Sequence, residues 1–266
     1  MLRTTLLASA LVLAAASAPA QTNYQDWATA GSPPLPTVPS SATPDNVRGT
    51  ATIFTDRAAF DSAAGPVPLE DFEGGATAPG AVNSCVEPVS SASNDVCFAP
   101  GDLIDGFQIT SSGGNGIVVL GDGFLPQPTA VVGANTFSEF TTVSFTETNV
   151  NAVALDAFSG SGGSLDVEIR VFDSGGSLAD TVTLNTSAAN VSEFFGILAP
   201  GPISRVEIEA LGGGGELFDN LAFGAGGGVL PPEASVPVPA LSTIGLVIAA
   251  GLLLLLAGFV LRTRKQ

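Results

Sequence analysis

The segment Leu165-Asp-Val-Glu-Ile-Arg-Val171 decides the fold class, because its apolar and charged residues alternate without a break. A period of two places the four apolar side chains on one face of a strand and the three charged ones on the other. The segment Arg205-Val-Glu-Ile-Glu209 repeats this pattern. Both segments therefore predict half-buried β-strands with one face against a core.

Similar apolar segments lie on both sides of this one, separated by clusters of Gly, Asn and Ser at the spacing typical of a sandwich. They predict strands at 106–111, 116–120, 141–146, 152–158, 178–184, 193–198 and 217–223. One segment differs: Thr55 or Asp56 can cap a helix that Gly65 and Pro66 end, and its Phe60 would pack on the sandwich. We expect an all-β, antiparallel two-sheet sandwich of the jelly-roll type with one short helix.

The N-terminus has the pattern of a signal peptide. A positive start at Arg3 precedes a short apolar stretch, Leu6 to Ala16, and Ala18-Pro-Ala20 supplies small residues for cleavage. We expect residues 1–20 to be removed before Gln21. An uncleaved anchor is the alternative.

The C-terminus predicts a membrane span. Residues 240–261 carry no charge, and about 22 residues at 1.5 Å each match a hydrocarbon core of about 30 Å. The basic tail 262–266 follows at once, so the positive-inside rule places the tail in the cytoplasm and the preceding domain outside. We expect an inner-membrane-anchored precursor whose domain lies outside the cytoplasm.

The segment Pro239-Ala-Leu-Ser-Thr-Ile-Gly245, the span and the basic tail together resemble the IPTL-CTERM sorting signal, in which Pro-Thr-Leu-Ser-x-Trp-Gly precedes one helix and a basic tail. Ala240 and Ile244 depart from that pattern. Val236-Pro-Val-Pro239 resembles the related PEP-CTERM signal, with Val238 in place of Glu. The resemblance assigns sorting roles to Val236, Pro237, Pro239, Leu241, Ser242, Gly245, Arg262, Arg264 and Lys265.

This resemblance implies that an exosortase-like enzyme removes the tail and releases the domain to the cell surface or the extracellular space. A permanent single-span anchor is the alternative. Between the two ends we expect three parts. Residues 21–48, rich in Pro, Ser and Thr, form a flexible leader in which Tyr24 and Trp27 could dock; residues 49–224 form the sandwich; residues 225–239 form a Gly/Pro linker.

Composition excludes several classes of function. The chain has 8 basic and 25 acidic residues, a formal net charge of −17, and residues 21–239 contain no lysine. Such a surface repels nucleic acids and anionic lipids and attracts cations such as Ca²⁺. The absence of histidine excludes Ser-His-Asp triads and His-containing zinc sites. The two cysteines, Cys85 and Cys97, predict a disulfide in an exported protein.

The acidic motif Leu69-Glu-Asp-Phe-Glu-Gly-Gly75 is the strongest candidate for a site. In a strand it would place Asp71 and Glu73 on one face, where two carboxylates repel unless a cation lies between them. With Asp219 in the last predicted strand, the motif resembles the bookends of galactose-binding-like jelly rolls, including many carbohydrate-binding modules. That resemblance implies a structural Ca²⁺ held by Glu73 and Asp219, with Asp71 as a third ligand. Ordinary solvated carboxylates are the alternative.

Two classes of function remain. The first is a non-enzymatic surface or extracellular-matrix protein, with no catalytic residues and an extracellular polysaccharide as a candidate partner. The second is a dedicated carbohydrate-binding protein or a glycan hydrolase using Glu70 with Glu73, or Asp71 with Asp219, as its carboxylate pair. The single Trp and single Tyr both lie in the leader, so the sandwich lacks the usual aromatic platform for sugars.

Overall fold

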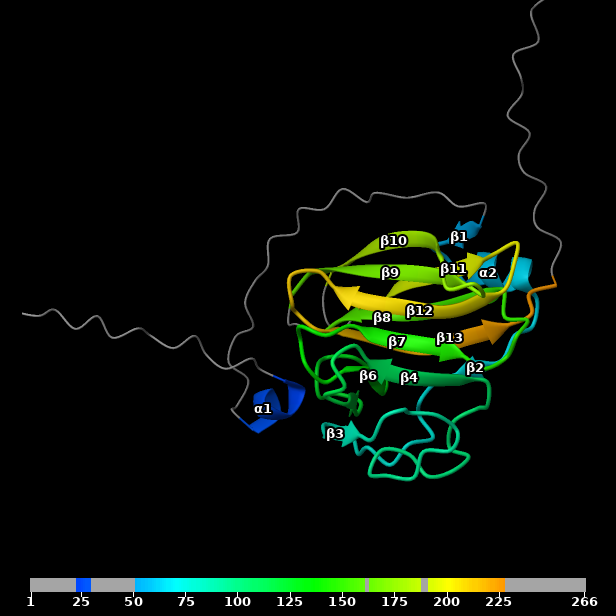
Figure 1. The fold of residues 1–266 in the computed structure, drawn as a ribbon. Helices are drawn as coiled ribbons and strands as arrows, with labels where there is room; N and C mark the ends of the chain where they lie inside the picture. The colour runs from blue at the N-terminus through cyan, green and yellow to red at the C-terminus, as the bar shows by residue number, and fades with distance from the viewer. Residues whose placement is uncertain (1–22, 30–50, 161–162, 188–190, 228–266) are drawn as a thin grey trace, which may run out of the picture. The chain divides into compact units, whose positions relative to one another are not determined.

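The computed structural model describes residues 23–29, 51–160, 163–187 and 191–227. These residues form two antiparallel sheets with few helices, which confirms the predicted all-β, two-sheet class (Figure 1). No helix in these ranges is long and apolar enough to cross a membrane. The predicted signal peptide 1–20, the span 240–261 and the tail 262–266 lie outside the described residues.

The larger sheet has eight strands in the order β1-β11-β8-β13-β6-β5-β3, and β2 pairs with β13 beside this path. Its strands are β1 (Thr52–Phe54), β2 (Leu69–Glu70), β3 (Val82–Cys85), β5 (Ile117–Leu120), β6 (Val131–Ala134), β8 (Ala152–Ser159), β11 (Glu193–Leu198) and β13 (Glu216–Gly224). The sequence pattern predicted the longer strands of this sheet and missed the short strands β1, β3 and β6.

The smaller sheet has five strands in the order β10-β9-β12-β7-β4. They are β4 (Phe107–Ser111), β7 (Thr141–Phe145), β9 (Leu165–Asp173), β10 (Leu178–Thr186) and β12 (Ile203–Ala210). The two alternating segments that predicted the fold are β9 and β12, and they pair with each other, Ile208 opposite Ile169. Their apolar residues are buried, while Arg170 and Glu207 form an ion pair on the other face.

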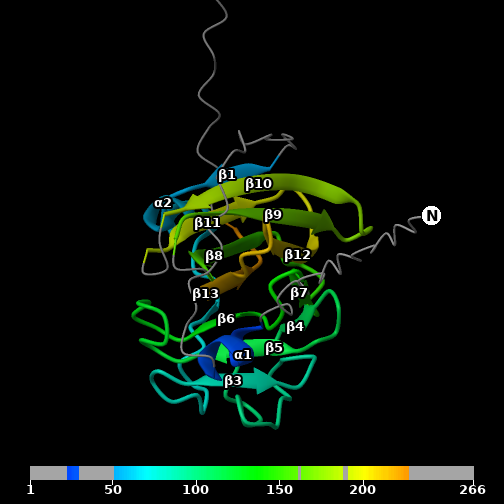
Figure 2. The ribbon, with the colours of Figure 1, turned by 90° about the vertical axis from the view of Figure 1, so that its left-hand side faces the viewer.

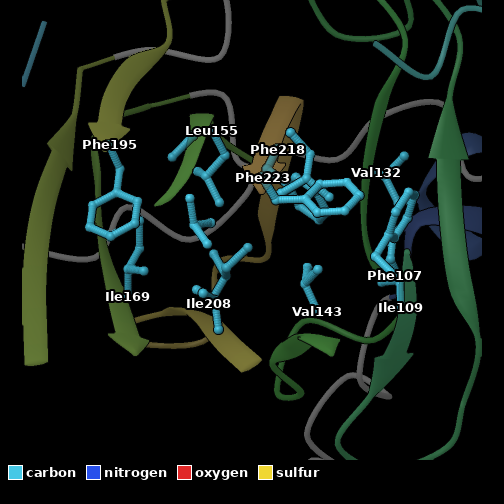
Figure 3. Packing of buried hydrophobic residues seen from close by; sticks show 14 of the residues in the cluster. Phe107, Ile109, Val132, Val143, Leu155, Ile169, Phe195, Ile208, Phe218 and Phe223 are labelled. Carbon is cyan, nitrogen blue, oxygen red and sulfur yellow. The ribbon is translucent and has the colours of Figure 1, made fainter. Parts of the chain in front are cut away.

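The main core lies between the two sheets, as Figure 3 shows. The smaller sheet contributes Phe107, Ile109, Val143, Ile169 and Ile208, and the larger sheet contributes Val132, Leu155, Phe195, Phe218 and Phe223. Strand alternation delivers these side chains, because every second residue of each strand faces the partner sheet. We call the opposite side of the larger sheet its outer face.

The predicted disulfide is confirmed. Cys85, at the end of β3, is bonded to Cys97, with an S–S distance of 2.05 Å and a Cα–Cα distance of 5.6 Å. Since β3 is an edge strand of the larger sheet, the bond fixes the following loop to that edge.

The predicted helix is also confirmed, as α2 (Arg57–Ala64). The Asp56 side chain caps it by accepting a hydrogen bond from the backbone N–H of Ala59 at 2.9 Å. At the other end, Gly65 donates its N–H to the carbonyl of Asp61. Phe60 is fully buried in an apolar cluster with small residues of the outer face, so α2 covers one end of that face.

A second helix, α1 (Tyr24–Thr29), was not predicted from the sequence. It contacts β3, as Figure 2 shows, and the predicted docking of Tyr24 is confirmed, because Tyr24 is fully buried. The Tyr24 ring packs edge-on against Phe137 with 4.6 Å between centroids. A side chain at Gly160 or Gly215 would collide with the Tyr24 hydroxyl, so both positions require glycine for close approach.

Replacing Tyr24 separates the contribution of its ring from that of its hydroxyl. The hydroxyl is buried without a hydrogen-bond partner among the described residues. Burying an unpaired hydroxyl is unfavourable, whereas a large buried ring contributes about 3 kcal/mol or more to stability. We expect Tyr24→Ala to lower the free energy of unfolding by about 3 kcal/mol and Tyr24→Phe to leave it unchanged or raise it, as measured by urea titration. An equal loss of unfolding free energy in both variants would contradict this account of Tyr24 packing.

Candidate ligand-binding site

The candidate site lies on the outer face of the larger sheet, where β8 and β13 run side by side next to α2. Asp156 of β8 is opposite Asp219 of β13 in the strand register. The register shifts between Asp219 and Ala222, and Asn220 within this bulge has a positive φ of 53°. Asn tolerates this conformation better than most residues. The bulge therefore re-aims Asn220 at the point where two carboxylates meet.

Asn220 links the two carboxylates. Its Nδ2 donates to Asp156 Oδ2 at 2.9 Å and to Asp219 Oδ2 at 3.2 Å, and its backbone N–H donates to Asp219 Oδ1 at 2.6 Å. Arg57 of α2 completes the network. Its Nη2 lies 3.3 Å from Asp156 Oδ2 and 3.1 Å from the carbonyl oxygen of Asn220. The guanidinium also lies over the Phe194 ring, 4.6 Å from its centroid. Arg57 is thus held in place from three sides.

A pocket of about 590 Å³ opens beside this network. Its volume falls in the usual range of small-molecule sites, about 300–1,000 Å³. We call it the Arg57 pocket. Its polar lining consists of Arg57, Asp61, Asp156 and Asn220, and its apolar lining includes Val67, Leu69 and Ala222. Leu69 is half exposed here, at 51% of its surface, so part of the apolar wall is available to a ligand.

Asp219, paired with Asp156 across the strands, is only 1% exposed. The pKa of its carboxyl is raised to about 7, mainly by burial and to a smaller extent by the charges of Asp156 and Glu73, while hydrogen bonding from Asn220 acts in the opposite direction. Asp219 and Glu73 therefore lie within electrostatic range of each other, although 146 positions separate them in the sequence. Burial is thus the main cause of the raised pKa of Asp219, and the neighbouring carboxylates add to it.

The other two predicted calcium ligands, Glu73 and Asp71, each accept a hydrogen bond from a backbone N–H. Strand β2 pairs with β13, Glu70 opposite Leu221, so the acidic motif and the last strand are adjacent. Exposed Glu73 accepts a hydrogen bond from the backbone N–H of Ala130 at 2.8 Å through Oε1. Asp71, also exposed, accepts the N–H of Glu73 at 3.2 Å. In the part of the chain that the structure describes, no three Asp, Glu, His or Cys residues are grouped as metal ligands usually are. The site thus offers a cation negative charge, but fewer than three grouped side-chain ligands.

Glu70, one residue of the candidate catalytic pair, is a buried clamp. Its Oε1 accepts the N–H of Phe72 and its Oε2 accepts the N–H of Ile104, both at 2.8 Å. Burial raises the pKa of this carboxyl, and the two backbone hydrogen bonds lower it. Since both oxygens accept hydrogen bonds from the backbone, Glu70 holds two loops together. The acidic motif is a strand only over Leu69–Glu70, and Phe72 adopts a positive φ of 54°, so the facing of Asp71 and Glu73 considered for a strand does not apply.

Sequence reasoning missed Arg57, Asp61 and Asp156 as site residues. One signal was present for Asp156, because it is the only charged residue in the otherwise apolar strand Ala152–Ser159. A charged side chain in a strand that is buried on both faces is costly unless it is paired or hydrogen-bonded, so such a residue predicts a partner nearby. No comparable signal marks Arg57 or Asp61 in the sequence, since charged residues are ordinary on a short helix.

The sequence matches no protein-family model, and no curated protein sequence matches it. Among solved structures it is similar to the enzymatically active domain of tailspike protein 4 of bacteriophage CBA120, with 18% identity over 45% of this chain and 19% of that chain, and a TM-score of 0.27. A family 29 carbohydrate-binding module shares 14% identity over 55% of this chain and 93% of its own length, with a TM-score of 0.30.

A third structure is the N-terminal part of Clostridium thermocellum endo-1,4-beta-D-xylanase 10B in complex with xylohexaose, with 11% identity over 60% of this chain and 28% of that chain, and a TM-score of 0.30. The match covers less than one third of the tailspike and xylanase chains. None of the three likenesses identifies a family for this chain.

Proposed function

We propose that this chain is a non-enzymatic, exported surface protein whose sandwich binds an extracellular glycan in the Arg57 pocket. The composition of the pocket carries the proposal. The planar groups of Arg57, Asp156 and Asn220 offer paired donors and acceptors, which suit neighbouring sugar hydroxyls. The apolar wall formed by Val67 and Leu69 suits the C–H face of a sugar ring.

The surroundings of the carboxylates support binding rather than hydrolysis. A glycosidase needs two carboxyl groups that both face the scissile bond. Asp156 is engaged by Arg57 and Asn220, and Asp219 is almost completely buried. The hydrogen bonds of the network therefore fix the positions of these side chains on the outer face. Asp61 is exposed in the pocket lining, and an enzyme would need a second carboxylate that is open to the ligand.

Glycan-array binding by the purified full chain in detergent tests this function. Asn220→Gly is the informative variant, because glycine accepts the positive φ of the bulge while the amide of the pocket is lost. We expect about tenfold weaker binding, the loss of one or two hydrogen bonds. Asp122→Asn, at an exposed carboxylate outside the pocket, is the matched control. Hydrolysis of a glycan, detected as newly formed reducing ends, would overturn the proposal. The absence of any glycan ligand on the array would also overturn it.

Delivery to the surface is proposed from the C-terminal motif. An exosortase-like enzyme would recognise Pro239 and its neighbours, and the membrane helix would serve only until cleavage. We expect deletion of residues 262–265, or replacement of Pro239, to block surface delivery in cell fractionation. The melting temperature of the sandwich should not change, because β13 ends at Gly224, before these residues. Unchanged delivery would leave a permanent anchor as the explanation.

A structural Ca²⁺ is the second part of the proposal. Glu73 and Asp219 would hold the ion, with Asp71 as a third ligand, and the electrostatic interaction of Glu73 with Asp219 supports a shared site. Binding at 100 times the dissociation constant would stabilise the fold by about 2.7 kcal/mol. We therefore expect a chelator to lower the melting temperature of the wild type by several degrees and that of Asp219→Ala much less. A wild-type melting temperature that does not change with the chelator would exclude a structural Ca²⁺.

A further inference from the structure

The Arg57 pocket has an electrostatic bias that narrows the class of glycan. Its lining contains two carboxylates, Asp61 and Asp156, and one guanidinium, Arg57. The Arg57 charge is already used, because it is paired with Asp156 at 3.3 Å and stacked on Phe194. Asp61 is different: it is exposed, and among the described residues its side chain has no hydrogen bond or ion pair. The pocket therefore keeps one uncompensated negative charge.

The end of α2 adds to this bias. Gly65 lies directly after the last helical residue and lines the pocket, and the last turn of α2 contains no basic residue. The carbonyl groups at a helix C-terminus carry a partial negative charge that favours cations. The whole chain acts in the same direction through its formal net charge of −17. Asp61, the C-terminal end of α2 and the net charge of the chain thus all favour a cationic ligand at this cavity.

We infer that the ligand of the Arg57 pocket is an amino-sugar glycan with free amino groups, so that an ammonium group faces Asp61. The inference rests on the proposed function and names its ligand class. The ammonium supplies the charge that the pocket lacks, while ring hydroxyls meet Asn220 and Asp156 and the ring face meets Val67 and Leu69. An acidic polysaccharide would be repelled, and a neutral one would leave the Asp61 charge uncompensated in the complex.

The test compares two oligosaccharides of equal length that differ only in the amino group: a glucosamine oligomer and its fully N-acetylated counterpart. Titration calorimetry with the purified full chain, at mildly acidic pH, measures both affinities. We expect the free amine to bind at least about tenfold more tightly, and the preference to fall as salt is added. Asp61→Asn should abolish the preference, and Asp122→Asn should preserve it.

The outcomes separate the inference from the function on which it rests. Equal affinities for the two oligomers, or a preference that survives in Asp61→Asn, would overturn the amino-sugar inference and leave a glycan-binding pocket. Failure of both oligomers to bind, while the glycan array finds a neutral ligand that depends on Asn220, would also overturn only the inference. Failure on the whole array would remove the proposed function itself.

Discussion

Raising the pH from about 5 to about 8 is expected to lower the free energy of unfolding of the sandwich by about 4 kcal/mol or more. Glu216 in β13 is the main cause. It is fully buried, and burial raises the pKa of its carboxyl from 4.5 to about 8. The Thr141 hydroxyl donates to its Oε1 at 2.7 Å, and its Oε2 has no hydrogen-bond partner among the described residues. Glu216 is therefore protonated in the folded protein at neutral pH.

The sign of the effect follows from proton binding. Between pH 4.5 and 8 the folded chain holds a proton on Glu216 that the unfolded chain has released. Stability is therefore fully present below the unfolded pKa and is lost as the pH rises through the folded one, by about 1.4 kcal/mol per pH unit. Asp219, with its pKa raised from 3.8 to about 7, adds a similar slope at lower pH.

Urea unfolding at a series of pH values measures this slope, and two variants assign it. Glu216→Gln keeps an acceptor for Thr141 and should remove the Glu216 contribution to the slope of stability against pH, up to about pH 8. Asp219→Asn should remove only the Asp219 contribution, up to about pH 7. Should Ca²⁺ bind as proposed, its addition would reduce the Asp219 part alone. A stability that is constant or rises between pH 5 and 8 would show that neither carboxyl keeps its proton in the folded state.

Regular alternation and cap residues explain why most of the fold could be predicted. Strands such as β9 are long enough for their period to be unmistakable, and Asp56 with Gly65 fixes both ends of α2. The missed strand β6 is short and contains Gly133, a residue that normally weakens a strand. A side chain there would collide with the backbone carbonyl of Glu216. Close packing of β6 on β13 sets this position, and local propensity does not report it.

The site was less predictable, for a related reason. The proximity of Glu73 to Asp219 was predicted from a resemblance of the two ends of the domain. The Arg57 pocket needs three further features: the packing of α2 on the outer face, the register of β8 with β13, and the bulge at Asn220. None of these is visible in local sequence, because each depends on which segments become neighbours after folding. Asp156 becomes part of a site only because folding brings Arg57 and Asn220 within hydrogen-bond distance of it.

Replacing Phe72 is expected to have the second large effect on stability. Phe72 is 1% exposed, and its ring contacts Phe218 and Phe107 edge-on, with centroid distances of 5.6 and 6.3 Å. Loss of a buried Phe costs about 3–5 kcal/mol, including the cavity that remains. The residue also holds a positive φ of 54°, which a bulky side chain adopts only when its surroundings compensate. Burial of the ring and the hydrogen bond from its N–H to Glu70 provide that compensation.

Two substitutions at this position distinguish the ring from the backbone. Phe72→Ala should lower the free energy of unfolding by about 4 kcal/mol. Phe72→Gly should be no worse, in contrast to the usual penalty for glycine, because glycine adopts a positive φ without strain. Leu69, three residues earlier, forms part of the wall of the Arg57 pocket, so both variants should also weaken glycan binding at temperatures where the sandwich remains folded. A Phe72→Ala protein with wild-type stability would mean that the acidic motif is not anchored in the core, and the pocket wall would then need another support.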